Sequence, residues 1–484
     1  MVLAHLSVSA QERLGLKLGD YSGISGIHLN PSSMSNSRYY FDVQLAGAGV
    51  FVNNNYLYLH KEDYSPTTFL QKDITFPTFT DQRGNERYVD EWYNKKLKHG
   101  YVNLRTYGPS ALLAYGRHAF GMYTSTRSIV RGKNVPYEVA KFGYESFDYD
   151  SLFNINFINE KDMHLDVLNM AEVGVSYSYI AYARNFDKMD IGVTFKYLKP
   201  QSGMKFYLDN VDYLLPNRDT LIVFNANGEM KMSLPVGYDN NNFGSDQSFF
   251  KGHGLGFDIG VTYTKTQSLQ RPYERFSSLC SQNVYDYDYR IGFSLLDIGY
   301  VTFREHVQVH EYEDASMFWE DLGEFDFENT NQVMREISKQ FFDDPDASNT
   351  GKQEYTLFLP SAVSAQFDYH FRDNWYVNST LIYGFPAGSK SYKRPHYFAV
   401  TPRYQSNYFG LNVPVSVFDF REPQVGISAR IYFLTVGTSN IAHYMGAKQM
   451  NGMDFYVSLK FNLLKGNCGR LKTEGCRGQE YGYH

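Results

Sequence analysis

Residues 453–463 read MDFYVSLKFNL, and this stretch near the end of the chain decides the fold class. One face carries the apolar residues, and the opposite face begins with Asp454, Tyr456, Ser458 and Lys460. Strict alternation of this kind predicts a β-strand, and its length suits one tilted crossing of a bilayer. An apolar face beside a charged one is typical of a wall with lipid outside and water inside. Edge strands of soluble sandwiches alternate in the same way, so other parts of the chain must separate the two folds.

The composition also favours a membrane barrel. Aromatic residues make up 17% of the 484 residues, and 42 Tyr and 37 Phe supply nearly all of them. Such residues are enriched in strands and in the aromatic girdles of membrane barrels. No window holds eighteen apolar residues, so a transmembrane helix is not expected. The net charge of −6 argues against a nucleic-acid partner.

The two ends of the chain carry their own signals. Residues 1–10 are interpreted as the remainder of a signal peptide, with a small-residue cleavage site that ends at Ala10. Residues 465–484 are expected to form a periplasmic tail that holds Cys468 and Cys476. Those cysteines either form a small disulfide in an oxidising compartment or remain free thiols. The sequence has no C-x-x-C pair and no metal-ligand cluster, so neither a metal nor a cofactor is predicted.

Alternating stretches recur along the chain and are predicted as strands. They are residues 39–52, 101–116, 119–130, 173–184, 189–198, 254–265, 287–303, 362–371, 375–385, 398–404, 409–418 and 424–437. A change of register at Leu295-Leu296 predicts a β-bulge. A bacterial barrel of one chain needs an even number of strands, so a hidden turn is placed between Arg430 and Tyr432. With that turn and the closing strand, the prediction is an all-β, antiparallel barrel of about fourteen strands.

The connections between these strands differ in length in a regular way. Residues 53–100, 131–167, 199–252 and 303–356 are long and polar, whereas the connections at 117–118 and 185–188 are short. Outer-membrane barrels have short periplasmic turns and long extracellular loops, and soluble sandwiches do not separate loop lengths in this way. This pattern therefore favours the outer membrane of a Gram-negative bacterium.

Three features are predicted within the long loops. Asn227-Gly228 predicts an external hairpin, and residues 329–342 read as an amphipathic helix. Residues 311–328 mix acids with aromatic side chains. This acidic segment fits a solvated loop, a divalent-cation site or a surface for a protein partner.

Several motifs resemble a known family. They are GIHLNPSS (26–33), YGPSALLAYGRHAFGMYTSTRS (107–128), YRIGFSLLDIGY (289–300), LPSAVSAQFDYHFRDNWYVNST (359–380) and GMDFYVSLKFNL (452–463). Together they resemble an uncharacterised outer-membrane barrel family of Bacteroidota, which is similar in plan to the fourteen-stranded FadL and PorV barrels. FadL-type proteins carry Asn-Pro-Ala in an N-terminal hatch, and Asn30-Pro31-Ser32 matches this motif except for its last residue. The resemblance implies a hatch over residues 11–38 and a barrel over residues 39–464.

The same resemblance implies two functions and leaves both open. FadL relatives pass hydrophobic molecules across the outer membrane, so a small hydrophobic ligand is one expectation. PorV relatives serve protein secretion, so an accessory protein that docks a partner through its external loops is the other. Outer-membrane lipid is an expected partner in both cases.

Charged residues on the inward faces of the strands are candidates for a site in the lumen. They include Asp190, Lys196, Asp258, Arg290, Asp368, His370, Arg430 and Lys460. The candidate ligand-binding residues are the hatch residues Asn30, Pro31 and Ser32 and the lumen residues Asp258, Asp368, His370 and Arg430. Lumens are normally polar, so structural ion pairing is the alternative. Asp368 and His370 share a face and suit acid–base chemistry, but without a nucleophile beside them the chain is not expected to be an enzyme.

Overall fold

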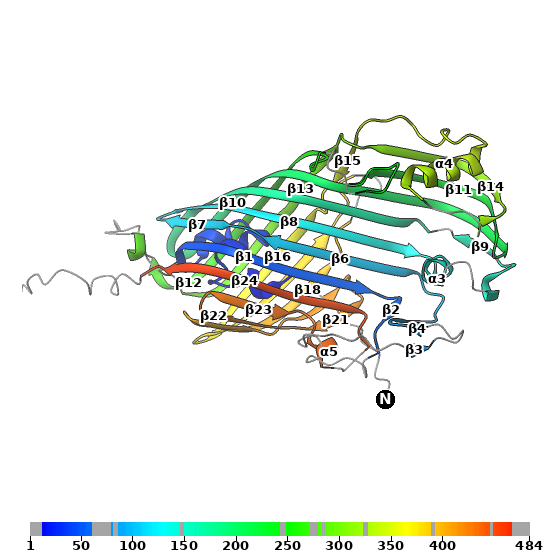
Figure 1. Ribbon diagram of the computed structural model, residues 1–484. Coiled ribbons are helices and arrows are strands. Elements are labelled where there is room, and N and C mark those ends of the chain that lie inside the picture. Colours follow the sequence, from blue (N-terminus) through cyan, green and yellow to red (C-terminus); the bar gives the residue numbers. More distant parts are fainter. Residues whose placement is uncertain are drawn as a thin grey trace, which may run out of the picture.

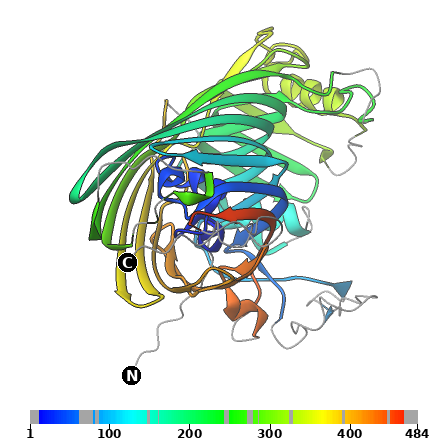
Figure 2. The same ribbon diagram turned by 90° about the vertical axis from the view of Figure 1, so that its left-hand side faces the viewer.

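One antiparallel sheet closes on itself, because the last strand pairs with the first from Tyr39↔Leu464 to Asn53↔Gly452. The computed structural model describes residues 12–60, 79–80, 86–145, 150–159, 161–242, 248–270, 279–282, 284, 286–322, 328–388, 393–445 and 449–466. The predicted signal peptide, Cys468 and Cys476 lie outside the described residues. The closed ring surrounds a lumen, as Figure 2 shows from one end.

The wall runs around the ring in chain order. Its strands are β1 (Tyr39–Asn54), β6 (Lys98–Tyr107) continued by β7 (Ser110–Tyr115), β8 (His118–Val135), β10 (Met163–Asn217), β12 (Gly252–Gln270), β13 (Tyr287–Phe303), β16 (Ala362–Arg372), β17 (Trp375–Gly384), β18 (Tyr397–Gln405), β19 (Phe409–Asn412) continued by β20 (Val415–Phe418), β21 (Glu422–Val425) continued by β22 (Ile427–Ile431), β23 (Leu434–Thr438) and β24 (Gly452–Leu464). The described wall has thirteen strands when β10 is counted once, close to the predicted fourteen. β10 itself folds back near Asn185, whose φ is 53°, and pairs with β8 on one arm and β12 on the other.

Two irregularities lie where the sequence predicts them. The register of β12 against β13 shifts between Phe257 and Ile259, and Leu296 and Asp297 both become buried. This confirms the bulge, because two consecutive side chains face inward only where the alternation is interrupted. The turn between β22 and β23 lies at Tyr432, with φ of 51°, within its predicted place at Arg430 to Tyr432.

The outward face of the wall is apolar. On β24, Met453, Phe455, Leu459 and Phe461 are exposed, whereas the polar residues between them are buried. The same arrangement holds on β10, β12 and β13, as predicted from the alternation; exposed residues there include Val175, Ile191, Val193, Phe195, Leu255, Phe257, Ile259, Phe293 and Leu295. A continuous apolar surface of this extent is unfavourable in water.

The long connections fold beyond one end of the barrel, on the right of Figure 1. There β10 extends to Asn217 and pairs with β11 (Thr220–Ser233), which pairs with β14 (Gln308–Trp319). The other elements of the long connections are β2 (Leu57–Tyr58), β3 (Phe79–Thr80), β4 (Glu86–Arg87), β5 (Asp90–Glu91), α3 (Tyr137–Glu145), η3 (Asp150–Leu152), β9 (Asn156–Asn159), α4 (Thr330–Phe342), β15 (Tyr355–Phe358) and α5 (Ile441–Tyr444). The short turns lie at the opposite end, near η4 (Leu279–Ser281). Among the described helices, none has the length and apolar character to cross a membrane.

The predictions for the external segments have mixed outcomes. The amphipathic helix is confirmed as α4, and Asn329 caps it by accepting a hydrogen bond from the amide of Gln332. The prediction of a hairpin at Asn227-Gly228 is wrong, because the chain reverses between Asn217 and Thr220. Asn227 and Gly228 lie in a part of β11 where the register against β14 shifts, so the pair occupies an irregular strand rather than a turn. Residues 323–327 of the acidic segment are outside the described residues.

The segment before the first strand lies in the lumen. Its elements are α1 (Leu14–Lys17), η1 (Gly23–His28) and α2 (Ser33–Asn36), which are the blue coils inside the ring in Figures 1 and 2. Nearly all of its side chains are buried, including Leu14, Ile24 and Met34. We call residues 12–38 the lumen segment.

Candidate functional site

The Asn-Pro turn attaches the lumen segment to one side of the wall. Asn30 Nδ2 donates hydrogen bonds to Gln366 Oε1 at 3.0 Å and to the carbonyl of Val261 at 3.2 Å. Asn30 Oδ1 accepts from the amide of Ser32 at 3.0 Å, which closes the turn, and the Ser32 hydroxyl contacts Thr262 Oγ1 at 2.6 Å. Asn30 and Ser32 therefore act in this structure as attachments to β12 and β16.

Glycines in the wall make room for this turn. A Cβ atom on Gly192 would lie 2.4 Å from the backbone of Pro31 and Ser32. On Gly260 it would lie 2.1 Å from Asn30 Oδ1. The turn touches the wall through its backbone at Gly192 and through the Asn30 side chain at Gly260, so closely that glycine fits best at both positions.

Other polar contacts attach the segment to further strands. Asp20 pairs with Arg290 of β13, and Asp42 of β1 accepts a hydrogen bond from the amide of Ile24 at 2.8 Å. Elsewhere, the Ser35 hydroxyl contacts Ser178 at 2.8 Å, Ser294 donates to the carbonyl of Leu29 at 2.7 Å, and Lys460 donates to the carbonyl of Ser22 at 2.5 Å. The contacts come from strands all around the ring and are all non-covalent.

A continuous network of buried charges links the segment to the wall. We call it the charge network; its members are Glu12, Lys17, Arg105, Arg127, Glu172, Lys196, Asp258, Asp297 and Arg394. In the lumen segment, Glu12 binds Lys17 at 2.9 Å and Arg394 at 2.5 Å. Arg394 precedes β18, at the end where the long connections emerge. The network therefore lies between the lumen segment and the end of the barrel where the long connections emerge.

Asp297 is the centre of this network. Its carboxylate accepts from Arg127 at 2.9 Å and from Lys196 at 2.6 Å, and it lies 3.6 Å from Arg394. Its side chain reaches the lumen because the bulge in β13 turns it inward. Arg127 also binds Glu172, at 2.6 Å. One bulge thus connects charges from four parts of the wall.

The predicted lumen residues are placed as follows. Asp258 lies in the charge network, 2.8 Å from Lys196. Asp368 lies in a separate pair, 2.5 Å from Arg403. Arg430 also faces inward: its guanidinium lies over the ring of Tyr21 in the lumen segment, 4.5 Å from the centroid, and donates to the carbonyls of Ser406 and Asn407 in a short turn.

His370 does not pair with Asp368 in the described part of the chain. It lies at the rim, where Nε2 is 2.7 Å from the carbonyl of Asp373 and the ring stacks on Tyr376 at 4.4 Å. Asp368 bonds instead to Arg403 and Tyr287, so in the described chain the two residues form no acid–base pair.

The other inward charges are also paired. Asp190 binds Lys188 at 2.9 Å, Arg290 binds Asp20, and Lys460 lies 3.8 Å from Asp42. Among the described residues, no cluster of His, Cys, Asp or Glu is arranged to hold a metal ion. Cys280 is disulfide-bonded, which the sequence does not predict.

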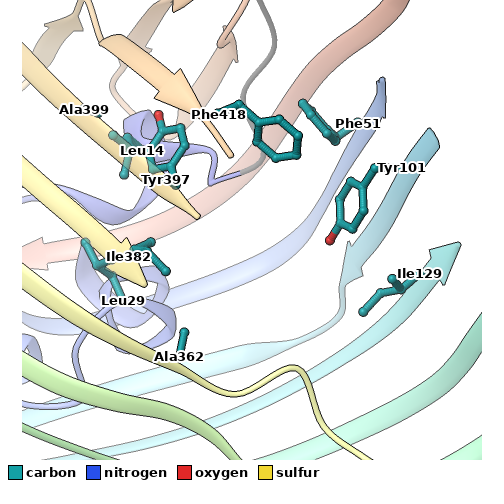
Figure 3. Packing of buried hydrophobic residues seen from close by; sticks show 10 residues of the cluster. All are labelled: Leu14, Leu29, Phe51, Tyr101, Ile129, Ala362, Ile382, Tyr397, Ala399 and Phe418. Atoms are coloured by element: carbon teal, nitrogen blue, oxygen red, sulfur yellow. The ribbon is translucent and has the colours of Figure 1, made fainter. Parts of the chain in front are cut away.

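An apolar region adjoins the charge network. Figure 3 shows its ten residues, which come from the lumen segment and from strands on several sides of the barrel. The rings of Phe51, Tyr101 and Phe418 form its aromatic part, with centroids 5.4–6.0 Å apart. Leu14 and Leu29 extend into it from the lumen segment. We call this region the apolar vestibule.

A small cavity of about 30 Å³ remains within the network, enough for about two water molecules. Its charged lining consists of Glu12, Arg13, Lys17, Arg105, Arg127, Lys196, Asp258, Asp297 and Arg394. A cavity of this size excludes an organic ligand as long as the lumen segment remains in place.

Ionisation of the lumen segment favours its docking at neutral pH. Burial alone would raise the pKa of Glu12, but Arg394 and Lys17 hold this pKa at about 2. Burial, together with Arg105 and Lys17, holds the pKa of His28 well below 6.5, so His28 docks as the neutral form. Both groups bind fewer protons in the docked state than in the unfolded chain, so acid disfavours docking.

Acidification is therefore expected to destabilise the protein through Glu12. Its contribution is complete above the unfolded pKa of 4.5 and is lost as the pH falls towards 2. The shift corresponds to about 3 kcal/mol. Thermal unfolding of the wild type and of Glu12→Gln should differ by a constant amount above pH 5 and converge near pH 2. A difference that does not change with pH would contradict this.

Comparison with known proteins gives a family. The family of unknown function DUF5723 matches residues 31–439. No curated protein matches the sequence. Among solved structures, the chain is similar to a FadL homologue of Pseudomonas aeruginosa, with 11% identity, a TM-score of 0.42 and coverage of 95% of this chain and 100% of that one.

Two toluene transporters are also similar. TbuX of Ralstonia pickettii has 8% identity and a TM-score of 0.41, with 95% of this chain and 100% of that chain covered. TodX of P. putida has 10% identity and a TM-score of 0.41, with 92% and 95% covered. Because the DUF5723 match spans most of the closed barrel, the chain belongs to that family of unknown function.

Proposed function

We propose that this chain is an outer-membrane protein whose lumen segment is a hatch that controls the binding or passage of a small, mostly apolar ligand. One observation carries the proposal: the lumen segment fills the barrel, and its contacts with the wall are hydrogen bonds and ion pairs. A segment attached by hydrogen bonds and ion pairs can leave its place without breaking the wall. The membrane, the hatch and the ligand each have their own support.

The apolar outer face supports a position in the outer membrane. A closed barrel satisfies its backbone hydrogen bonds within the wall, which a bilayer requires. The strands alternate apolar side chains outside with polar side chains inside, as membrane barrels do. We place the long connections outside the cell and the short turns in the periplasm, since this is the usual arrangement.

An arginine on the outer face is expected to destabilise the protein according to its depth. Ile259 is exposed near the middle of β12, whereas Phe371 is exposed beside a short turn. Ile259→Arg should cost about 2–4 kcal/mol and Phe371→Arg about 0–1 kcal/mol in a bilayer. Urea unfolding from lipid vesicles measures both, and equal costs would argue against a bilayer around this wall.

The polar attachment of the lumen segment supports a hatch. Its contacts include buried ion pairs and hydrogen bonds to β1, β10, β12, β13, β16 and β24. Each of these bonds contributes modestly in net terms, because water replaces it when the segment leaves. Such a segment is held in one place while remaining able to exchange with a solvated state.

The apolar vestibule supports the choice of ligand class. Its aromatic and aliphatic side chains lie next to the hatch, and Leu14 and Leu29 belong to both. An apolar ligand entering the outer half of the barrel would bury its surface against these side chains. Displacing Leu14 and Leu29 would then couple ligand binding to hatch movement.

Deletion of residues 12–36 tests this function. The protein purified from its native membrane should carry a small apolar molecule, detectable by solvent extraction and mass spectrometry, and the deletion variant should lose it. The matched control is Phe51→Ala, which shortens the vestibule but leaves the hatch, and which should weaken retention without abolishing closure. If neither change alters the extracted molecules, the ligand proposal is wrong.

A second candidate function is an accessory protein that docks a partner outside the cell. The observation favouring it is the outward exposure of Ile158, Phe224 and Phe318 on the external strands β9, β11 and β14, which extend beyond the barrel. Exposed apolar side chains on such a sheet suit a protein interface. Phe318→Glu should abolish capture of a stoichiometric partner in detergent and leave ligand retention unchanged if this function holds.

We also propose that the chain is not an enzyme. Asp368 and His370, the residues best suited to acid–base catalysis by sequence, bond to different partners. Hydrolysis of a lipid or peptide substrate that His370→Ala abolishes would overturn this.

A further inference from the structure

Arg13 is a buried cation in the lumen that has no carboxylate partner among the described residues. Its side chain is 3% exposed. Nη2 donates to the carbonyl of Gly49 at 2.8 Å, to the carbonyl of Asn103 at 3.1 Å and to Asn103 Oδ1 at 3.4 Å. These acceptors are all neutral, and Nε has no hydrogen-bond partner in the described part of the chain. A buried charge in this state is costly unless a counter-ion accompanies it.

The cavity beside Arg13 has an excess of positive charge. Six cationic side chains line it, namely Arg13, Lys17, Arg105, Arg127, Lys196 and Arg394, against the carboxylates of Glu12, Asp258 and Asp297. Glu172 behind the lining adds one negative charge through its bonds to Arg105 and Arg127. The balance remains positive by two.

Two further observations concern the net charge around the cavity and its unpaired donors. Asp454 interacts electrostatically with Arg13, but its carboxylate bonds to the amide of Ser439 and forms no ion pair with Arg13 in the described chain. If the charge of Asp454 is included, the excess around the cavity falls to one positive charge. Arg105, which also lines the cavity and is 9% exposed, has an Nε without a hydrogen-bond partner among the described residues.

We propose that this cavity binds one small monovalent anion, of the size of a halide or a formate, between Arg13 of the hatch and the cations of the wall. The cavity has room for about two water molecules, so it admits an ion of a few atoms and excludes larger anions. The free donors of Arg13 and Arg105 provide charge-assisted hydrogen bonds. Because Arg13 belongs to the hatch and Arg105 to β6, the anion joins the two parts and favours the closed state.

The site is independent of the ligand proposed above. The anion sits in the closed barrel, whereas the apolar ligand would enter the vestibule beside it. Loss of anion binding would therefore leave ligand retention to be tested by itself, and a barrel without a transported ligand would still bind the anion.

Bromide provides the direct test. Crystals of the full chain soaked in sodium bromide should show an anomalous difference peak in the cavity between Arg13 and Arg105. In solution, the melting temperature should rise with chloride in a saturable way at constant ionic strength, with gluconate as the balancing anion. Sodium formate in place of chloride distinguishes a carboxylate site from a halide-selective one, and stabilisation by either anion supports the proposal.

Variants separate the site from general salt effects. Arg13→Gln should lose both the bromide peak and the dependence on chloride, whereas Arg13→Lys, which keeps the charge, should retain a weaker dependence. The control Arg335→Gln removes an exposed cation paired with Asp346 and should respond to chloride like the wild type. An empty cavity in bromide, or the same chloride dependence in Arg13→Gln as in the wild type, would overturn the proposal.

Discussion

Gly192→Ala should release the hatch while the barrel stays folded. The new Cβ atom would lie 2.4 Å from the backbone of Pro31 and Ser32, and a backbone cannot move aside as a flexible side chain does. We expect the docked state to lose about 3 kcal/mol, or about a hundredfold in its equilibrium. Hydrogen exchange measures this: amides of the hatch such as Ile24 and Ser32 should exchange about a hundredfold faster, with strand amides unchanged.

The matched control is Gly410→Ala in β19. Gly410 also lies in the wall, but the atom nearest to its new Cβ would be Arg430 Nε at 3.5 Å, an ordinary contact. This substitution should leave exchange in both regions unchanged. If Gly192→Ala accelerates exchange in the strands as much as in the hatch, the segment is part of the folded barrel rather than a separable hatch.

Asp297→Asn should cause the largest loss of stability among single substitutions in the charge network. Asp297 accepts from Arg127 and Lys196 and lies near Arg394, so its neutralisation leaves three buried cations with less compensation. Removing one partner of a buried ion pair costs about 3–5 kcal/mol. Urea unfolding of the refolded protein measures this cost.

Asp346→Asn is the control for that substitution. Asp346 pairs with Arg335 at 2.9 Å, but both side chains are more than half exposed. Such pairs contribute about 0–1 kcal/mol, because water screens them. Equal effects of the two substitutions would mean that the network contributes no more than a surface pair.

The alternation of apolar and polar residues predicts the wall well, because successive side chains of a strand face outward and inward in turn. Residues 453–463 have their apolar side chains outside and their polar ones buried. The same signal locates the bulge at Leu295-Leu296, since a bulge breaks the period. It does not predict the structure at Asn227-Gly228. These turn-forming residues lie within the irregular strand β11 and not in a turn.

The candidate site is only partly accessible to sequence reasoning. Asp258 and Lys196 are named from their inward positions, whereas Arg105, Arg127, Glu172, Asp297 and Arg394 are missed. Their inward positions on the strands are a usable signal for Arg105, Arg127 and Glu172. Which charges meet depends on how the strands are staggered around the ring, and no local pattern encodes this. Asp297 faces inward only because of the bulge, and Arg394 comes from a connection.

The central claim is that residues 12–38 close an otherwise open barrel, and conductance across a planar lipid bilayer tests it most directly. The wild-type protein should conduct little, because the hatch is packed against the wall and the two cavities beside it, of about 30 Å³ and 70 Å³, are small. A variant lacking residues 12–36 should insert and produce large, stable conductance steps. A deletion variant that folds and inserts but conducts no more than the wild type would contradict the account.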